Sequence, residues 1–115
     1  TTAQKRNAIL FYGKLKCSTC HSGPLMTDQK HYNIAAPQFE IGKDETGLDL
    51  GRYLVTGDET DRFEFRVPGL RNVTHSAPYL HNGAFYNLAD VILHHLDAEK
   101  SLLNYDPVAE LIQVS

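Results

Sequence analysis

Apolar and polar positions separate most clearly between residues 87 and 96. Positions i, i+3, i+4, i+7 and i+8 of this stretch are occupied by Leu88, Val91, Ile92, His95 and Leu96. This spacing is typical of the stripe that an amphipathic helix buries. Asn87 is a favourable N-cap, and Asp90 stands three residues later, as in a capping box. The pattern therefore predicts a helix from Asn87 onward with His95 inside its buried stripe.

The first half of the chain predicts one helix and one long loop. Residues 4 to 15 have a broad apolar side and predict a helix, although Gly13 lowers helix stability there. Residues 22 to 57 are rich in Gly, Pro, Asp and Asn, and they predict a loop with a short helix near residues 49–54. A loop of this length is unusual in an ordinary domain, but a cofactor can order it.

Three shorter segments complete the pattern. The charge run 58–62 indicates a solvated turn, and residues 63–68 alternate like a short extended segment that Pro68 and Gly69 end. Asp106-Pro107 predicts the start of a last helix over residues 108–114. The chain is thus expected to be mainly α-helical with long loops.

Composition limits the class of protein. A chain of 115 residues with 42% apolar content and charges of both signs predicts one soluble domain, residues 1–115. The formal net charge of −3 gives no reason to expect a nucleic-acid partner. No apolar run approaches the length of a membrane span, and no signal peptide is visible. Because Thr1 is not an initiator Met, we expect a processed terminus or an excerpt of a longer chain.

The sequence Cys17-Ser18-Thr19-Cys20-His21 is a C-x-x-C-H motif, which indicates covalent attachment of haem c. Cys17 and Cys20 would form the two thioether bonds, and His21 would be the proximal iron ligand. A zinc site would need two further ligands, and the chain has only these two cysteines. A redox dithiol would need a preceding strand, whereas a helix-like stretch precedes the motif. Haem attachment is therefore the favoured interpretation.

The helical spacing also suggests a second iron ligand. His95 falls within the apolar stripe, whereas His94 lies about a quarter turn away. An imidazole on an apolar face needs a partner, which is either the haem iron or a core hydrogen bond. Met26 is a further candidate, but it follows His21 by only five residues and is expected to pack at the haem edge. We expect His95 to ligate, with His94 and Met26 as alternatives.

Residues 65–73 (FRVPGLRNV) and 77–83 (APYLHNG) carry a family resemblance. Together with Gly57-Asp58, Asp61-Arg62 and residues 88–95, they are similar to the dihaem cytochrome c peroxidase family, which includes the methylamine-dehydrogenase maturation enzyme. The resemblance covers roughly residues 8 to 96. It implies a cytochrome c-like fold around one haem, in the C-terminal electron-transfer domain of such an enzyme.

The resemblance also implies partners and a compartment. A second haem domain or subunit would reduce peroxide, a soluble protein would donate electrons, and assembly of haem c would place the protein in the bacterial periplasm. Because the chain has a single C-x-x-C-H motif, a stand-alone monohaem carrier and a haem-based sensor remain alternatives.

The family's distal ligand falls at the position of His95, where peroxidases generally have Met and the maturation enzyme has Tyr. Ligation by imidazole in place of a thioether is expected to lower the reduction potential. The resemblance further implies a calcium ion held partly by the carbonyls of Ser76 and Pro78, which suits the preference of calcium for oxygen ligands. For Arg71 it implies a structural role such as an ion pair with a haem propionate.

Overall fold

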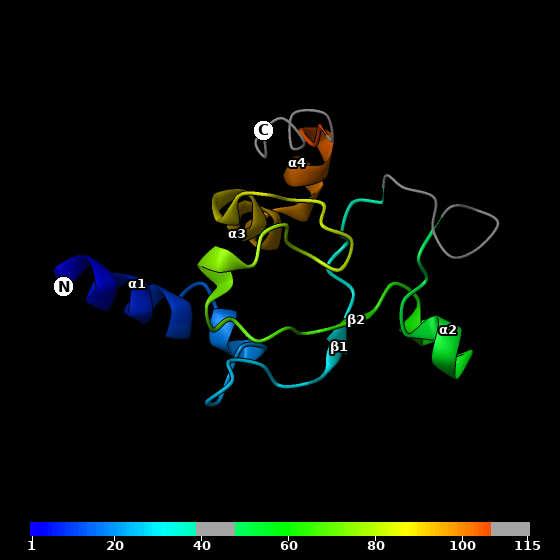
Figure 1. The fold of residues 1–115 in the computed structure, drawn as a ribbon, viewed down its shortest axis with the longest axis horizontal. Coiled ribbons are helices and arrows are strands. Elements are labelled where there is room, and N and C mark those ends of the chain that lie inside the picture. The colour runs from blue at the N-terminus through cyan, green and yellow to red at the C-terminus, as the bar shows by residue number, and fades with distance from the viewer. Residues whose placement is uncertain (39–47, 107–115) are drawn as a thin grey trace. The chain divides into compact units, whose positions relative to one another are not determined.

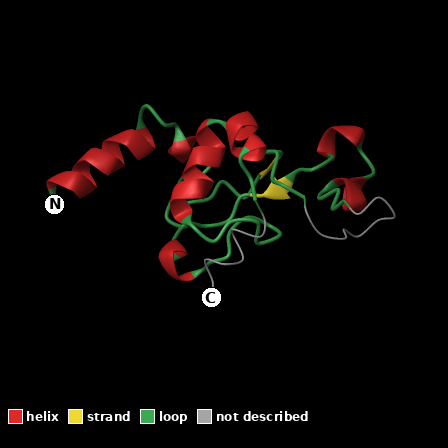
Figure 2. Cartoon of the chain, turned by 90° about the horizontal axis from the view of Figure 1, so that it is seen from above, coloured by secondary structure: helices red, strands yellow, loops and turns green. Residues whose placement is uncertain are grey.

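The computed structural model describes residues 1–38 and 48–106. Figure 1 shows the course of the chain, and Figure 2 shows that helices make up most of its regular structure, with one short sheet. The chain divides into two units. Unit 1 consists of Thr1–Lys30 and Arg66–Val73, and unit 2 consists of His31–Phe65 and Thr74–Ser115.

Unit 1 begins with helix α1, Thr2–Tyr12. Thr1 and Gln4 form a capping box: the Gln4 N–H donates to Thr1 Oγ1 at 3.1 Å, and the Thr1 amino group donates to Gln4 Oε1 at 2.9 Å. The helix ends at Tyr12, three residues before the predicted end, because Gly13 takes a non-helical conformation. The predicted first helix is therefore confirmed with a shorter range.

The returning segment of unit 1, residues 66–73, packs against the loop that follows the C-x-x-C-H motif. The Val67 N–H donates to the Lys30 carbonyl at 2.9 Å, and Thr27 Oγ1 donates to the Val67 carbonyl at 2.6 Å. Gly69 lies so close to the loop that a Cβ there would stand 2.7 Å from the Leu25 carbonyl oxygen. Segments some 40 residues apart in the sequence thus hold one another in place.

Most of the remaining elements lie in unit 2, although two of them each include one residue of unit 1, Arg66 or Val73. Strands β1 (His31–Tyr32) and β2 (Phe65–Arg66) form a two-stranded sheet, so the extended segment predicted near residues 63–68 is confirmed. Helix α2 (Tyr53–Thr56) begins later than the predicted short helix near residues 49–54. The charge run forms the 3₁₀-helix η2 (Glu59–Asp61), an exposed turn as expected, and a further 3₁₀-helix, η3, covers Val73–His75.

Helices α3 (Leu88–Leu96) and α4 (Ala98–Leu103) form the helical part of unit 2, and they lie against each other in Figure 1. Asn87 caps α3 as predicted, but its side chain accepts from the Ala89 N–H rather than from Asp90. Helix α4 was not predicted; Asp97 caps it by accepting from the Lys100 N–H at 3.0 Å. The helix predicted over residues 108–114 lies outside the described residues.

The buried side of α3 differs from the prediction. His94 is 1% exposed, whereas His95 is exposed and Ile92 and Leu96 are 52% and 53% exposed. His94 is buried because it packs beside Phe85, with ring centroids 5.5 Å apart, and both of its ring nitrogens have protein partners. Leu88 and Val91 of the predicted stripe are half-buried, whereas Ile92, His95 and Leu96 are exposed within unit 2. The predicted burial is therefore wrong for His95 and these two neighbours.

The core of unit 2 is built around Phe85. The Tyr79 N–H donates to the Phe85 carbonyl at 2.6 Å, and the Tyr105 ring meets the Phe85 ring edge-on at 5.3 Å. Tyr105 also donates its hydroxyl to the Ala84 carbonyl at 2.8 Å. Within residues 1–38 and 48–106, none of the helices has the length and apolar character needed to cross a membrane.

Candidate haem centre

The C-x-x-C-H motif forms a single tight turn in unit 1. The 3₁₀-helix η1 covers Cys17–Thr19, and the N–H groups of Cys20 and His21 both donate to the Cys17 carbonyl, at 3.3 and 3.0 Å. Both cysteines are free and half-buried. The turn therefore keeps two thiols and one imidazole within a five-residue segment, which is the donor set that covalent haem attachment requires.

His21 is oriented by a hydrogen bond to the loop after the motif. Its Nδ1 lies 3.1 Å from the Met26 carbonyl oxygen, and because a carbonyl can only accept, Nδ1 carries the proton. The lone pair is then on Nε2, the nitrogen left to ligate a metal. The residues present thus fit a haem with His21 as proximal ligand.

From the sequence, Met26 is an alternative ligand that is expected to pack at the haem edge. In the structure Met26 has φ 55°, and its N–H donates to the Gly23 carbonyl at 3.0 Å, closing a turn that returns its own carbonyl to His21. Nothing in the residue type announces this role, because any residue could supply the carbonyl. The nearby Gly23-Pro24 pair was the available signal for a turn.

His95 on α3 has the same hydrogen-bonding arrangement as His21. Its Nδ1 donates to the Val91 carbonyl one turn earlier, at 2.7 Å, which again places the lone pair on Nε2. The side chain is exposed, as are Ile92 and Leu96 of the same helix. An apolar face that carries an imidazole with its Nε2 lone pair available is suited to a haem. The structure is therefore compatible with His95 as the second ligand, and ligation stays a prediction.

His94 has no nitrogen left for a metal. Its Nε2 donates to the Ile34 carbonyl at 2.7 Å, and its Nδ1 accepts from Ser101 Oγ at 3.0 Å. His94 is thus the hydrogen-bonded core histidine that the sequence left open as the alternative to ligation. The bonding favours His95 over His94 as ligand.

The remaining predicted site residues occupy both units. In unit 1, Arg71 is exposed, and its Nε donates to the Pro24 carbonyl at 2.5 Å, so it ties the returning segment to the turn near His21. In unit 2, Ser76 and Pro78 are exposed in the loop after η3. No cluster of three His, Cys, Asp or Glu side chains suited to a metal occurs in the described part of the chain. The calcium site and the propionate contact of Arg71 therefore remain predictions.

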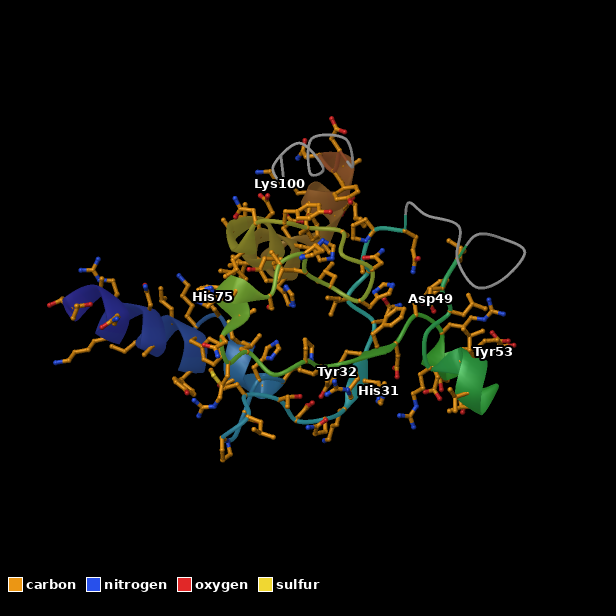
Figure 3. The ribbon with its side chains drawn as sticks, in the orientation of Figure 1. His31, Tyr32, Asp49, Tyr53, His75 and Lys100 are labelled. Carbon is orange, nitrogen blue, oxygen red and sulfur yellow. The ribbon has the colours of Figure 1, made fainter. Side chains whose placement is uncertain are left out.

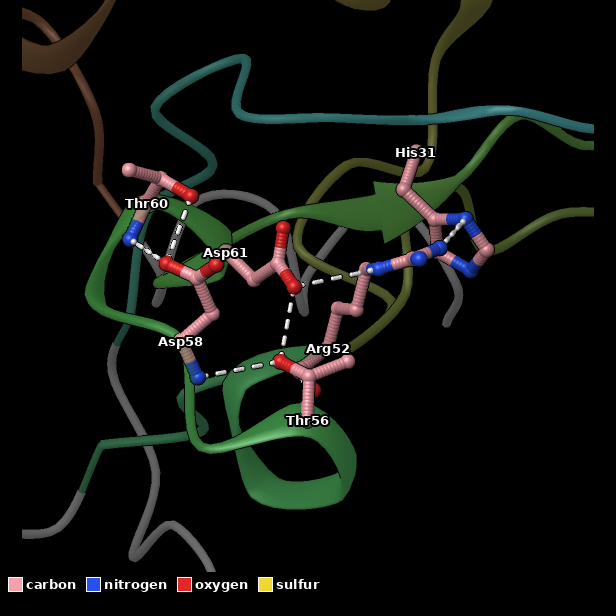
Figure 4. A network of polar contacts seen from close by, with 6 residues as sticks. All are labelled: His31, Arg52, Thr56, Asp58, Thr60 and Asp61. Carbon is pink, nitrogen blue, oxygen red and sulfur yellow. Dashed lines mark hydrogen bonds and ion pairs between the residues drawn. The ribbon is translucent and has the colours of Figure 1, made fainter.

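A polar network in unit 2 was not predicted (Figure 4). Arg52 Nε lies 3.2 Å from Asp61 Oδ2, and Arg52 Nη1 donates to His31 Nδ1 at 3.0 Å. Thr56 Oγ1 donates to the same Asp61 oxygen at 2.7 Å. The network connects β1, α2 and η2, and it uses His31 as an acceptor in a structural role.

The fold and this site define a small, mainly helical domain with a C-x-x-C-H turn. No family model matches the chain. It is 36% identical to the cytochrome-c peroxidase IdrP1 of Pseudomonas sp. (strain SCT), over 79% of this chain and 30% of that protein. It is 34% identical to the cytochrome c peroxidase Ccp of Escherichia coli (strain K12), over 97% of this chain and 23% of that protein.

Two further similarities connect the chain with MauG. The methylamine utilization protein MauG of Methylorubrum extorquens is 32% identical over 80% of this chain and 24% of that protein. A solved MauG-like protein associated with microbial copper homeostasis has a TM-score of 0.69 and 30% identity, and the match covers 80% of this chain and 32% of that one. The chain belongs to the family of dihaem cytochrome c peroxidases and MauG.

These similar proteins thus confirm the predicted family and support the predicted cytochrome c-like fold. The chain spans about 30% or less of the length of these three curated relatives.

Proposed function

We propose that this chain is the C-terminal, electron-transfer haem domain of a dihaem peroxidase-like oxidoreductase in the bacterial periplasm. Cys17 and Cys20 attach one haem c, and His21 and His95 ligate its iron. A soluble protein donates electrons, and a second haem domain or subunit receives them and reduces peroxide. The second domain is consistent with the small share of its relatives that the chain spans.

The observation that carries the proposal is the matched bonding of two histidines. His21 and His95 each donate Nδ1–H to a backbone carbonyl, so each offers Nε2 to a metal. Hydrogen bonds of this kind fix the ring and raise the basicity of the ligating nitrogen. When bound, haem supplies reversible one-electron chemistry. The protein's contribution is to hold each imidazole in the correct tautomer.

Two imidazole ligands determine which part of the reaction this domain can perform. Reduction of one peroxide to two waters consumes two electrons and two protons, and it needs an iron position that substrate can reach. If His21 and His95 both held the iron, no position would remain for peroxide, so this domain would pass electrons on and would not reduce peroxide itself. Arg71 would neutralise a propionate, and the carbonyls of Ser76 and Pro78 would supply part of a calcium site shared with the second domain.

The test is the haem content and mass of the protein as purified from its source. We expect a chain or complex larger than these 115 residues, with a second haem, and peroxide reduction by the whole assembly. One covalent haem on a chain of this length, with no haem partner, would leave the carrier or sensor alternative. Absence of covalent haem would overturn the proposal itself.

A further inference from the structure

The two units carry opposite charge, although the net charge of the whole chain is only −3. Unit 1 has one carboxylate, Asp28. Its cationic side chains are Lys5, Arg6, Lys14, Lys16, Lys30, Arg66 and Arg71. All other carboxylates of the chain belong to unit 2. The unit that contains the C-x-x-C-H turn is therefore strongly basic.

The cations on α1 and directly after it are not used to hold unit 1 together. Lys5, Arg6, Lys14 and Lys16 are all exposed, and none of them takes part in an ion pair with a described residue. Lys14 and Lys16 lie within three residues of Cys17. Positive charge is thus concentrated next to the haem attachment turn, where the fold does not require it.

Exposed apolar side chains accompany these cations on α1. Ile9 and Tyr12 are 72% and 67% exposed, and the helix has no buried residue. A protein interface typically combines apolar side chains with a surrounding polar and charged rim, and Tyr is enriched in such interfaces. The helix and the residues after it offer both components.

We propose that this basic surface, formed by Lys5, Arg6, Lys14, Lys16, Ile9 and Tyr12, docks a soluble redox protein through an acidic face of that partner. The inference rests on the proposed electron-transfer function, and it specifies the partner as a redox protein with an acidic surface. Complementary charge raises the rate of encounter and orients the partner, while the apolar side chains slow its release. Docking beside the C-x-x-C-H turn brings the partner to the unit that holds the cofactor.

The arrangement of α1 argues for a protein rather than a lipid surface. Its first half, up to Asn7, is polar apart from Ala3, and its second half, from Ala8 to Tyr12, is apolar. A helix that lies on a membrane segregates polar and apolar side chains around its axis instead. Separation along the axis gives a compact apolar area next to a cationic one.

The experiment measures binding of the intact haem-loaded protein to an immobilised acidic haem protein, the soluble domain of cytochrome b5. Lys14→Glu is compared with Lys100→Glu, which makes the same charge change on α4 of unit 2 (Figure 3). We expect Lys14→Glu to weaken binding roughly threefold at 0.1 M salt, a typical size for one exposed charge contact. Lys100→Glu should have little effect, because Lys100 is not one of the residues that form the proposed surface.

Other measurements separate this inference from the proposed function. Haem content, the absorption spectrum and the reduction potential should be the same in both variants; loss of covalent haem in the unmodified protein would contradict the proposed function instead. Equal effects of Lys14→Glu and Lys100→Glu would overturn the docking surface, as would no effect of either, which is the result if the rest of the protein covers α1. Tighter, Lys14-dependent binding to anionic vesicles or duplex DNA than to the acidic protein would also overturn it.

Discussion

His94 and Ser101 join helices α3 and α4 through a hydrogen bond of 3.0 Å between Nδ1 and Oγ. The other ring nitrogen of His94 donates to the Ile34 carbonyl at 2.7 Å, so one imidazole connects three segments of unit 2. His95 is the next residue on α3. The contact therefore fixes the helix that presents the predicted ligand.

We expect His94→Leu to destabilise the folded protein by about 2 kcal/mol, because it leaves the partly buried Ile34 carbonyl and Ser101 Oγ without their hydrogen bonds to His94. Ser101→Ala should cost about 1 kcal/mol, and the two changes should not add, since they remove the same bond. Chemical denaturation of the double-mutant cycle measures the coupling. His75→Ala, at an exposed residue of η3 labelled in Figure 3, is the control and should change little. Additive effects would show that the His94–Ser101 bond contributes nothing.

His95→Ala should open one axial position of a bound haem. The expected signs are a high-spin absorption spectrum and binding of carbon monoxide to the ferrous protein, with little loss of stability because the side chain is exposed. His75→Ala should keep the spectrum of the unmodified protein. An unchanged six-coordinate spectrum in His95→Ala would assign the ligand to another residue.

His95→Met should keep six-coordination and raise the reduction potential, on the order of 0.1 V, because a thioether favours ferrous iron more than imidazole does. Potentiometric titration of both proteins measures the difference. A lower or equal potential would contradict His95 as an axial ligand in the unmodified protein.

The sequence predicted those parts of the structure that depend on nearby residues. The Asn87 cap and the helix after it follow from a local hydrogen bond and a regular spacing, and the C-x-x-C-H turn follows from five adjacent residues. The choice between His94 and His95 as the buried residue was predicted incorrectly. The burial of His94 depends on contacts with Ile34 and Phe85, which lie outside α3. Helical spacing within residues 87–96 contains no information about these contacts.

The carbonyl partner of His21 could not be predicted for a different reason, because it depends on backbone conformation and not on residue type. Met26 contributes a backbone atom, whose direction is set by the positive φ of that residue and by Gly23, not by its side chain.

Helix α4 was missed because its six residues are too few for a clear apolar period, and its formation depends on the Asp97 cap and on packing against α3.

Gly51 is required by a close approach between two backbones. It has φ +63° and forms a bridge to Glu64, and a Cβ on it would overlap the Glu64 carbonyl oxygen. We expect Gly51→Ala to destabilise the protein by about 2–4 kcal/mol through strain and loss of this approach. Gly57 has a similar φ of +69°, but a Cβ on it would meet no atom within 4 Å, so Gly57→Ala should cost only about 1 kcal/mol. Equal losses in denaturant titrations would show that φ alone, not the Glu64 contact, matters.

Asp58, the N-cap of η2, makes the stability of the folded protein depend on pH in the acid range. Its carboxylate accepts from the Thr60 N–H at 3.0 Å and from Thr60 Oγ1 at 2.8 Å, and these bonds hold the pKa of Asp58 below its ordinary value of 3.8. Because the folded protein lowers this pKa, the contribution to stability is present above pH 3.8 and is lost as the pH falls through the lower folded value. Asp58→Asn keeps an acceptor for Thr60 but does not titrate. The difference in free energy of unfolding between the unmodified protein and Asp58→Asn should therefore become smaller below about pH 4. A difference that stays constant or grows in acid would contradict the role of the carboxylate. Glu99→Gln on α4 is the control for the loss of one charge.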